Sequence, residues 1–435
     1  MKITVHRGAE GTGGNCIELR SGKSRILLDY GAPPGAVPEA VVLDIPGLYD
    51  AAKDPILAIL LSHTHPDHYG ALLVKPINPG IKVFMTEIME DVIRITAKMR
   101  RDGPKLGANI HYFRKGHKFI VGRFVITPYL MDHSAAESFA FLIESDGKRV
   151  IYTGDFREHG NKAAAFKQFL AANMGPIDAL ITEGTRADLE KGPAEAEVMA
   201  HIEDNLKGRN GALFVMCAGQ DIGLLNSLAL LARNTRRYLV VDGYVGLLLE
   251  RLKGLALKQG VELKIPGLDT EYLRIIRNSA TQRVYQLTEY TETFSRMRPK
   301  LFGWDWVRAN LDRLIIPVRA GTQFWVGEQI NDLRGATLVY SAWEDYAEEE
   351  GMGEALAWFK TRRLADVPTP FSDHAYFSAI RKLVENKRPR RIIPVNTAHP
   401  DKFTATFGKR ARIPKNGEEF EIREIRGQEI RGQDI

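Results

Sequence analysis

The sequence contains very few cysteines and no long apolar segment. Cys16 and Cys217 are its only two cysteines, and each lies in an apolar stretch. A disulfide framework is therefore excluded as the basis of the fold, and we expect both thiols to be reduced and buried. The apolar runs are shorter than the roughly 20 residues that span a bilayer. The first residues, MKITVHRGAEGTGG, also lack the apolar core of a signal peptide. We expect a cytoplasmic protein with no membrane contact.

The length of the chain indicates the number of domains, and the charge distribution indicates a class of binding partner. A chain of 435 residues is too long for one ordinary core and predicts two domains. The formal net charge is only +6. However, residues 375–415 contain eleven Lys or Arg side chains against two acidic ones. Such a block is often a solvated surface, but it also favours a polyanionic partner through counterion release.

Strand patterns dominate the first part of the chain and return at its end. Short segments rich in strand-forming residues recur up to DALITEGT (178–185). The same strand pattern returns at RRIIPVNT (390–397). Between them, GALFVMC (211–217) and RRYLVVDGY (236–244) each precede a helical pattern. That alternation predicts a mainly parallel sheet with helices on its faces. We therefore predict an α/β protein in which one domain interrupts another, with boundaries at 1–190, 191–365 and 366–435.

A cluster of metal-competent side chains follows one of the predicted strands. The stretch ILLSHTHPDHYG (59–70) places three histidines and an aspartate within six residues: His63, His65, Asp67 and His68. A turn would need only Pro66 and Gly70. So many ligand groups directly after a buried strand indicate one half of a metal site.

Two further strand ends supply candidates for the other half. His133 follows the strand in PYLMDHS, and Asp155 follows the strand in VIYTGD. His63, His65 and His133 would form a three-nitrogen site, while Asp67, His68 and Asp155 would form one richer in oxygen. Two zinc ions held in this way would activate a hydroxide and polarise a phosphoryl or carbonyl oxygen.

These motifs resemble the metallo-β-lactamase family. The stretches HTHPDH, DHS and TGD occur in the family's order, preceded by RILLDYG, in which the predicted strand ends at Asp29. The resemblance implies an αββα sandwich with zinc at one edge of its two sheets. It also implies that Asp29 supports the histidine loop without binding the metal itself.

Three later stretches resemble the motifs of the β-CASP nucleases, in particular ribonuclease J. They are LITEGT with Glu183, TPFSDHAYF with His374, and RRIIPVNTAHPDKF; the intervening VVDGY and LVYSAWEDY are similar to the inserted β-CASP domain. The resemblance implies hydrolysis of RNA phosphodiester bonds by a metal-activated hydroxide. Asp67 would orient that hydroxide, His374 would assist the leaving oxygen, and Glu183 would fix the His374 tautomer. Candidate substrate contacts are Ser372, Arg388, Arg390 and Arg391.

One position departs from the ribonuclease J pattern. Asn396 stands where a histidine would complete the second metal site, and His399 follows three residues later. The second ion could therefore bind weakly, be ligated by His399 instead, or be manganese-like, because an amide oxygen is a poor zinc ligand. Artemis-like DNA nucleases also lack this histidine.

The leading interpretation is a zinc-dependent ribonuclease that acts on single-stranded RNA, as an exonuclease, an endonuclease or both. A DNA nuclease of the Artemis type is the main alternative. A non-catalytic RNA-binding subunit and a small-molecule metallo-hydrolase are further alternatives. The sequence leaves the oligomeric state open, and a dimer is compatible with it.

Overall fold

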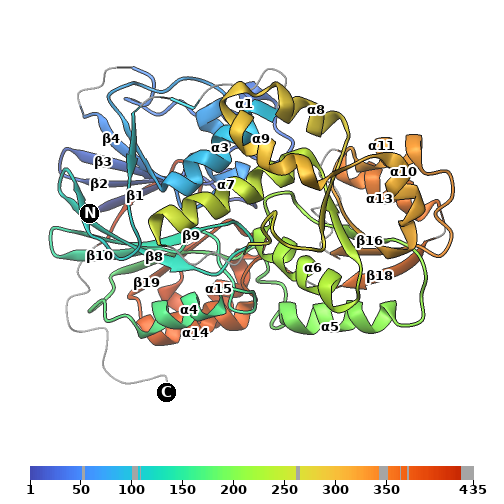
Figure 1. Ribbon diagram of the computed structural model, residues 1–435. Coiled ribbons are helices and arrows are strands. Elements are labelled where there is room, and N and C mark those ends of the chain that lie inside the picture. Colours follow the sequence, from blue (N-terminus) through green and yellow to red (C-terminus); the bar gives the residue numbers. More distant parts are fainter. Residues whose placement is uncertain are drawn as a thin grey trace.

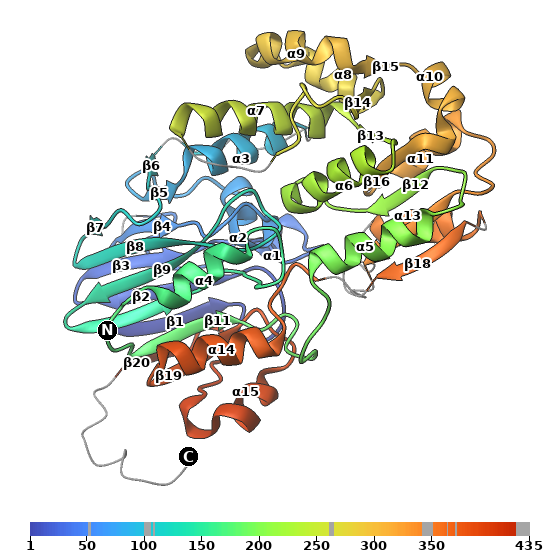
Figure 2. The same cartoon turned by 60° about the horizontal axis from the view of Figure 1, so that its bottom comes forward.

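The structure of the chain is a computed structural model. It describes residues 1–50, 54–99, 106–107, 109–260, 265–341, 351–362, 364–369 and 372–422. Most of the LVYSAWEDY stretch and residues 370 and 371 of the His374 motif lie outside this part. A sandwich of two sheets occupies one side of the molecule, and a third sheet with its own helices occupies the other (Figures 1 and 2).

The first sheet of the sandwich has the order β20-β1-β2-β3-β4-β5-β6. Its strands are β1 (Lys2–Arg7), β2 (Cys16–Ser21), β3 (Ser24–Leu28), β4 (Ile56–Leu60), β5 (Lys82–Met85), β6 (Ile110–Tyr112) and β20 (Glu419–Glu421). All five residues of β3 are buried, as expected for a strand without polar alternation. The predicted buried strand before the histidine loop is β4, which runs parallel to β3 and β5.

The second sheet has the order β19-β11-β10-β9-β8-β7. Its strands are β7 (Phe119–Val121), β8 (Phe124–Met131), β9 (Ser138–Ser145), β10 (Lys148–Tyr152), β11 (Ala179–Glu183) and β19 (Arg391–Val395). Asp146 and Gly147 turn the chain between β9 and β10 with φ values of 50° and 70°, as a two-residue hairpin requires. Strands β10, β11 and β19 are parallel, so their carboxyl ends meet at one edge.

Helices cover the outer faces of the sandwich. The main core lies between the two sheets and includes Leu27, Ile59, Phe141 and Val150. A second core packs α4 (Ala163–Ala171) and α14 (Phe377–Lys387) on the second sheet. The remaining helices of this domain are α1 (Pro38–Val41), α2 (Pro66–Tyr69), α3 (Glu87–Met99) and α15 (Pro400–Phe407). The predicted αββα sandwich is confirmed.

The third sheet contains seven strands, all paired in parallel. Its order is β15-β14-β13-β16-β12-β17-β18. The strands are β12 (Leu213–Met216), β13 (Tyr238–Val241), β14 (Leu273–Ile276), β15 (Leu301–Phe302), β16 (Leu314–Val318), β17 (Thr337–Ser341) and β18 (Ala365–Thr369). The mainly parallel sheet predicted for this region is confirmed. β18 continues to Thr369, a few residues past the predicted boundary at 365.

Helices pack on both faces of the third sheet through separate apolar cores. One face is covered by α5 (Glu195–Leu206), α6 (Ile222–Asn234), α7 (Gly243–Gln259), α8 (Ser279–Gln286) and α9 (Thr291–Met297). The other is covered by α10 (Trp304–Ala309), α11 (Thr322–Gln329) and α13 (Met352–Lys360). Of the helices that the structure describes, none combines the length and apolarity that a bilayer crossing requires.

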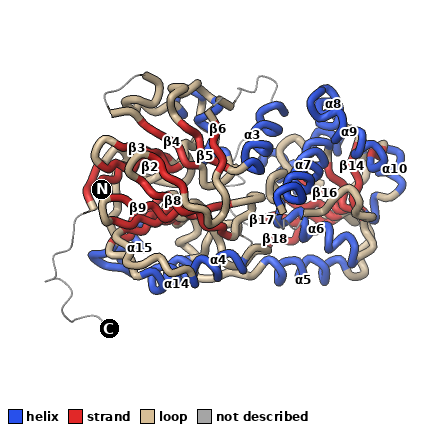
Figure 3. Tube along the Cα trace, turned by 60° about the vertical axis from the view of Figure 1, so that its left-hand side comes forward, coloured by secondary structure: helices blue, strands red, loops and turns tan. Residues whose placement is uncertain are grey.

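Among the described residues, two of the contacts between the sandwich and the third sheet's helices involve α3, which lies beside α7 (Figure 3), and Arg157. Helix α3 has one face in the sandwich core, with Met89 and Ile93, and the other in the core beside α7, with Val92 and Ile95. The second contact is the buried guanidinium of Arg157, which binds Glu195 on α5. Arg157 also binds Asp132, the residue that precedes the candidate ligand His133.

Candidate metal centre

The metal-competent side chains lie at one edge of the sandwich, where several strands end together. His63 follows β4, His133 follows β8, Asp155 follows β10, and Glu183 is the last residue of β11. Strand β8 runs antiparallel to β9, which runs antiparallel to β10. The carboxyl ends of β8, β10 and β11 therefore coincide, and loops there carry the ligands, as is common in sheets of this kind.

His63, His65 and His133 form the first ligand group, with one nitrogen from each ring within 4.8 Å of the others. The Nδ1 atom of His133 donates to the carbonyl oxygen of Asp373 at 2.8 Å. Its Nε2 lone pair is thereby directed towards His65 Nδ1, at 3.1 Å. His63 Nε2 is buried with no hydrogen-bond partner. Three imidazole nitrogens that face one another in this way can supply lone pairs to one divalent metal ion when the rings are neutral.

The protonation states of these imidazoles also suit a metal site. Burial lowers the pKa of His63 and His133 well below the usual value, and the neighbouring histidines lower both further. Burial likewise lowers the pKa of His65. Metal binding requires neutral imidazole, and these surroundings favour that form at neutral pH.

The second ligand group contains His63, His68 and Asp155, also within 4.8 Å of one another. His68 Nε2 lies 3.0 Å from Asp155 Oδ2 and 3.4 Å from Asp67 Oδ2. Burial alone would lower the pKa of His68, but the carboxylates of Asp155 and Asp67 raise it well above its usual value. A site that attracts a proton so strongly also attracts a metal cation.

Asp29 supports this group from behind. Its carboxylate accepts four hydrogen bonds, from Ser62 N, Ser62 Oγ, His68 Nδ1 and Tyr152 OH, at 2.6–2.7 Å. The bond from His68 Nδ1 leaves Nε2 as the atom that faces Asp155 and Asp67. Orientation of a ligating imidazole by a carboxylate is the usual arrangement behind a bound metal.

Glu183 and His374 lie beside Asp155 and form a third group with it. His374 Nδ1 donates to Glu183 Oε2 at 2.9 Å, while Glu183 Oε1 accepts the backbone N–H of Phe156 at 2.7 Å. Burial alone would lower the pKa of His374, but Glu183, Asp373 and Asp155 raise it to about 10. A protonated imidazole is thus held next to the ligand groups.

Three contributors to the site were missed by the sequence reading. The Asp373 backbone orients His133, and its carboxylate accepts from Ser134 Oγ at 2.9 Å. Asn15 Nδ2 lies 3.2 Å from His68 Nε2, and Tyr152 binds Asp29. The glycine-rich run GTGGN that precedes Cys16 was the available signal for Asn15, since such runs allow close backbone approach.

The candidate substrate contacts are not all at the site. Ser372 is buried beside it, but its Oγ accepts the backbone N–H of His374 at 3.0 Å. Arg388, Arg390 and Arg391 lie before or at the start of β19, whereas Asn396 follows its end. Five strand residues span about 16 Å, so the three arginines are at the far edge of the sheet. Arg390 there binds Asp178 at 3.1 Å.

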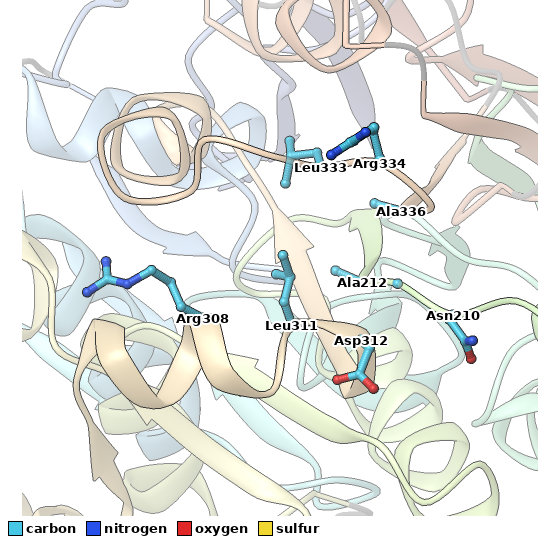
Figure 4. A pocket seen from close by; sticks show the side chains of 9 residues that line it. Asn210, Ala212, Arg308, Leu311, Asp312, Leu333, Arg334 and Ala336 are labelled. Carbon is cyan, nitrogen blue, oxygen red and sulfur yellow. The ribbon is translucent and has the colours of Figure 1, made fainter.

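A separate cavity of about 320 Å³ lies at the amino-terminal edge of the third sheet (Figure 4). Asn210, Arg308, Asp312 and Arg334 supply its polar lining. None of its described lining residues belongs to the three ligand groups. This cavity is therefore distinct from the candidate metal centre.

Comparison with known proteins agrees with this geometry. Residues 32–210 match the beta-lactamase superfamily domain. The chain is 27% identical over 251 residues to an RNase J-like protein of Methanocaldococcus jannaschii, covering 53% of this chain and 54% of that protein. It is 22% identical over 413 residues to ribonuclease J of Mycobacterium tuberculosis, covering 91% of this chain and 68% of that protein.

A solved structure shares the fold across nearly the whole chain. The crystal structure of a protein of unknown function from Enterococcus faecalis V583 superposes with a TM-score of 0.73 at 17% identity, covering 96% of this chain and 99% of that one. The chain spans about half the length of the curated relatives it matches first. The matched domain and the two-sheet sandwich show a metallo-β-lactamase fold, and the chain is similar to ribonuclease J-like proteins.

Proposed function

We propose that the protein is a metal-dependent nuclease that hydrolyses phosphodiester bonds of RNA. The observation that carries this proposal is the Glu183–His374 pair beside the two ligand groups. A hydrolase for small esters would need the metal site alone. The paired acid suits a substrate with a poor alkoxide leaving group, because proton donation in the transition state lowers that barrier.

The bound metal would be zinc at the three-nitrogen group, with an oxygen-richer position beside it. His63, His65 and His133 would hold the first ion, and Asp67, His68 and Asp155 would hold the second. Such an ion supplies Lewis-acid chemistry, by polarising a phosphoryl oxygen and activating water. His63 is shared by the first two ligand groups, and Asp155 is shared by the second group and the group with Glu183 and His374.

Side chains of the protein would orient the attacking water and transfer the protons. Asp67 has a partly exposed carboxylate beside His68 and would orient the attacking water and accept its proton. His374 carries its proton on Nδ1 towards Glu183, so that Nε2 would face the substrate and donate to the leaving oxygen. The raised pKa of His374 keeps the imidazolium available at neutral pH. Glu183 fixes this orientation through both of its oxygens.

The domain boundaries, the RNA partner and the cellular location are proposed together with this function. We propose that residues 1–190 and 366–435 form the nuclease domain, except that β18 carries residues 366–369 into the third sheet, and that the inserted domain lies between them. Single-stranded RNA would be the partner, and the two buried, unpaired thiols are compatible with a cytoplasmic location. The three arginines at the far edge of the second sheet would contact only a substrate that extends well beyond the metal centre.

The test is a cleavage assay on 5′-labelled single-stranded RNA and on DNA of the same sequence, with zinc and with manganese. We expect the protein to cleave RNA in preference to DNA, and we expect Asp67→Ala to abolish this cleavage. The product ladder distinguishes exonuclease from endonuclease action. Equal or better cleavage of DNA would favour the Artemis-like alternative. Tight RNA binding without cleavage of either strand would favour a non-catalytic subunit.

A further inference from the structure

Asn396 lies between the second ligand group and the glycine-rich loop near the amino terminus. It follows β19 and is buried, with 2% of its surface exposed. Its amide contacts Gly13 on one side and Asp155 on the other. This is the position at which the ribonuclease J-like pattern would supply a metal-binding histidine.

The orientation of this amide follows from its partners. The backbone N–H of Gly13 can only donate, and it lies 2.6 Å from Asn396 Oδ1. The amide nitrogen Nδ2 therefore faces Asp155, at 3.1 Å from Oδ1 and 3.3 Å from Oδ2. An amide nitrogen has two donor hydrogens and no lone pair for a metal. Asn396 thus presents donors, not a ligand, to the second group.

Reversal of the amide would be unfavourable on both sides. Its oxygen would then face the Asp155 carboxylate, and its NH2 group would face the Gly13 N–H. Each mismatch leaves a buried polar group unsatisfied, at about 1–3 kcal/mol. The backbone is also fixed, because Asn396 N donates to Gly8 O at 2.7 Å and its carbonyl accepts from Thr185 Oγ1 at 3.0 Å.

The Gly13 side of this contact is equally constrained. Gly13 has φ of +81°, and an added Cβ would lie 2.5 Å from Pro34 Cδ. The absence of a side chain at Gly13 therefore lets this loop lie against Pro34 while its N–H reaches Asn396. His399 does not substitute for the missing nitrogen, since it is partly exposed at the start of α15 and lies outside the ligand groups found among the described residues.

We propose that the metal centre is asymmetric. The three-histidine group binds one ion tightly, and the second position binds its ion at least about 100-fold more weakly. The cause is Asn396, which presents a hydrogen-bond donor to the Asp155 carboxylate in place of a metal ligand. The lower bound is the upper end of the effect of removing a supporting residue from a metal site. This inference rests on the metal site of the proposed function, but not on the nature of the substrate.

The experiment measures metal binding and not turnover. Metal-free protein is titrated with Zn²⁺ by calorimetry, and the zinc retained after a desalting column is measured by plasma mass spectrometry. We expect about one retained ion per chain and a second, weaker binding phase. Asn396→His should raise the retained zinc to about two, because a histidine tolerates the left-handed backbone found here at φ of 52°. Asn386→His, on the exposed face of α14, is the matched control and should leave one.

Asn396→Asp gives a second route if the histidine variant fails to fold. Its carboxylate can still accept from Gly13 and adds an oxygen ligand, so the second phase should become tighter. Two equally tight ions in the unaltered protein would overturn the proposal, as would unchanged stoichiometry in a folded Asn396→His variant. One retained ion in a protein without nuclease activity would support the asymmetry while rejecting the function.

Discussion

The carboxylate of Glu183 is shared between the backbone N–H of Phe156, at 2.7 Å, and Nδ1 of His374, at 2.9 Å. The first partner follows a metal-ligand candidate directly in sequence, and the second comes from 191 positions further along the chain. One side chain therefore fixes the acid relative to Asp155. Both oxygens are needed for this, because both partners are donors.

Glu183→Gln should lower turnover by about 10- to 100-fold, the range found when a supporting partner is removed. An amide oxygen can accept from only one of the two donors, so its NH2 group must oppose the other. Metal content should not change. The measurement is RNA cleavage rate beside retained zinc, with Glu190→Gln on the exposed surface as control. Equal loss in both variants would contradict the role of Glu183.

Asp29→Asn should weaken metal binding by about 10- to 100-fold. The carboxylate accepts from four donors, and the amide NH2 would oppose at least one of them. His68 would lose its fixed orientation. Calorimetric zinc titration measures the effect, and Tyr152→Phe, which removes a single donor, should cause a smaller loss. Unchanged zinc affinity in Asp29→Asn would show that His68 is oriented by other contacts.

Arg157→Met should reduce the free energy of unfolding by about 3–5 kcal/mol. Arg157 is fully buried and binds Asp132 at 3.4 Å and Glu195 at 2.9 Å. Removal of one member of a buried ion network leaves the others uncompensated. Urea denaturation checks this, with the exposed Arg334→Met expected to unfold as the unaltered protein does. A loss as small as that of the control would mean that Glu195 has other sufficient partners.

The pH dependence of stability should change in Asp221→Asn. Burial raises the pKa of Asp221 to about 7, whereas an unfolded aspartate has a pKa of about 3.9. The folded state therefore holds the proton more tightly between these values. The stability due to neutral Asp221 is complete below about pH 4 and is lost as the pH rises to about 7.

Asparagine retains the helix cap, in which Asp221 Oδ1 accepts from Leu224 N, but it does not ionise. Between pH 5 and pH 8 the unfolding free energy of Asp221→Asn should rise by about 2–3 kcal/mol relative to the unaltered protein, at 1.36 kcal/mol per pKa unit over about two units. Denaturation curves at both pH values give the difference. A constant difference would mean that Asp221 is ionised throughout.

Removal of metal should lower the melting temperature of the unaltered protein. An ion that binds only the folded state adds about 2.7 kcal/mol at a free concentration 100 times its dissociation constant. His63→Ala lacks the nitrogen that has no other partner and should be insensitive to a chelator. Calorimetric melting with and without the chelator tests both. A chelator effect that persists in His63→Ala would place the ion elsewhere.

The ligand groups could be predicted because their signals are local in sequence. Four metal-competent groups directly after β4 need no tertiary information, and the ends of β8 and β10 follow from strand patterns. The parallel third sheet was equally visible as repeated strand-then-helix pairs. The structure brings His63, His65 and His133 together from two separate loops, one after β4 and one after β8.

Other features could not be predicted, because they depend on which end of a strand a residue occupies or on contacts between distant segments. Arg388, Arg390 and Arg391 are close to Asn396 in sequence, yet the whole of β19 separates them in space. Asp373 acts on His133 through its backbone carbonyl, which no residue type can signal. The hydrogen bond between Gly13 and Asn396 joins residues 383 positions apart, so the orientation of the Asn396 amide could not be read from either segment.

The return of the chain to the sandwich has a consequence for the order of folding during synthesis. β20 pairs with β1, and β19 pairs with β11, so both sheets of the sandwich stay incomplete until residues beyond 390 have left the ribosome. Among the described residues, the strands of the third sheet all lie within 213–369, so this sheet can form first. His374 and Asn396 therefore join the metal centre last, and a truncated chain should carry a finished inserted domain beside an unfinished site.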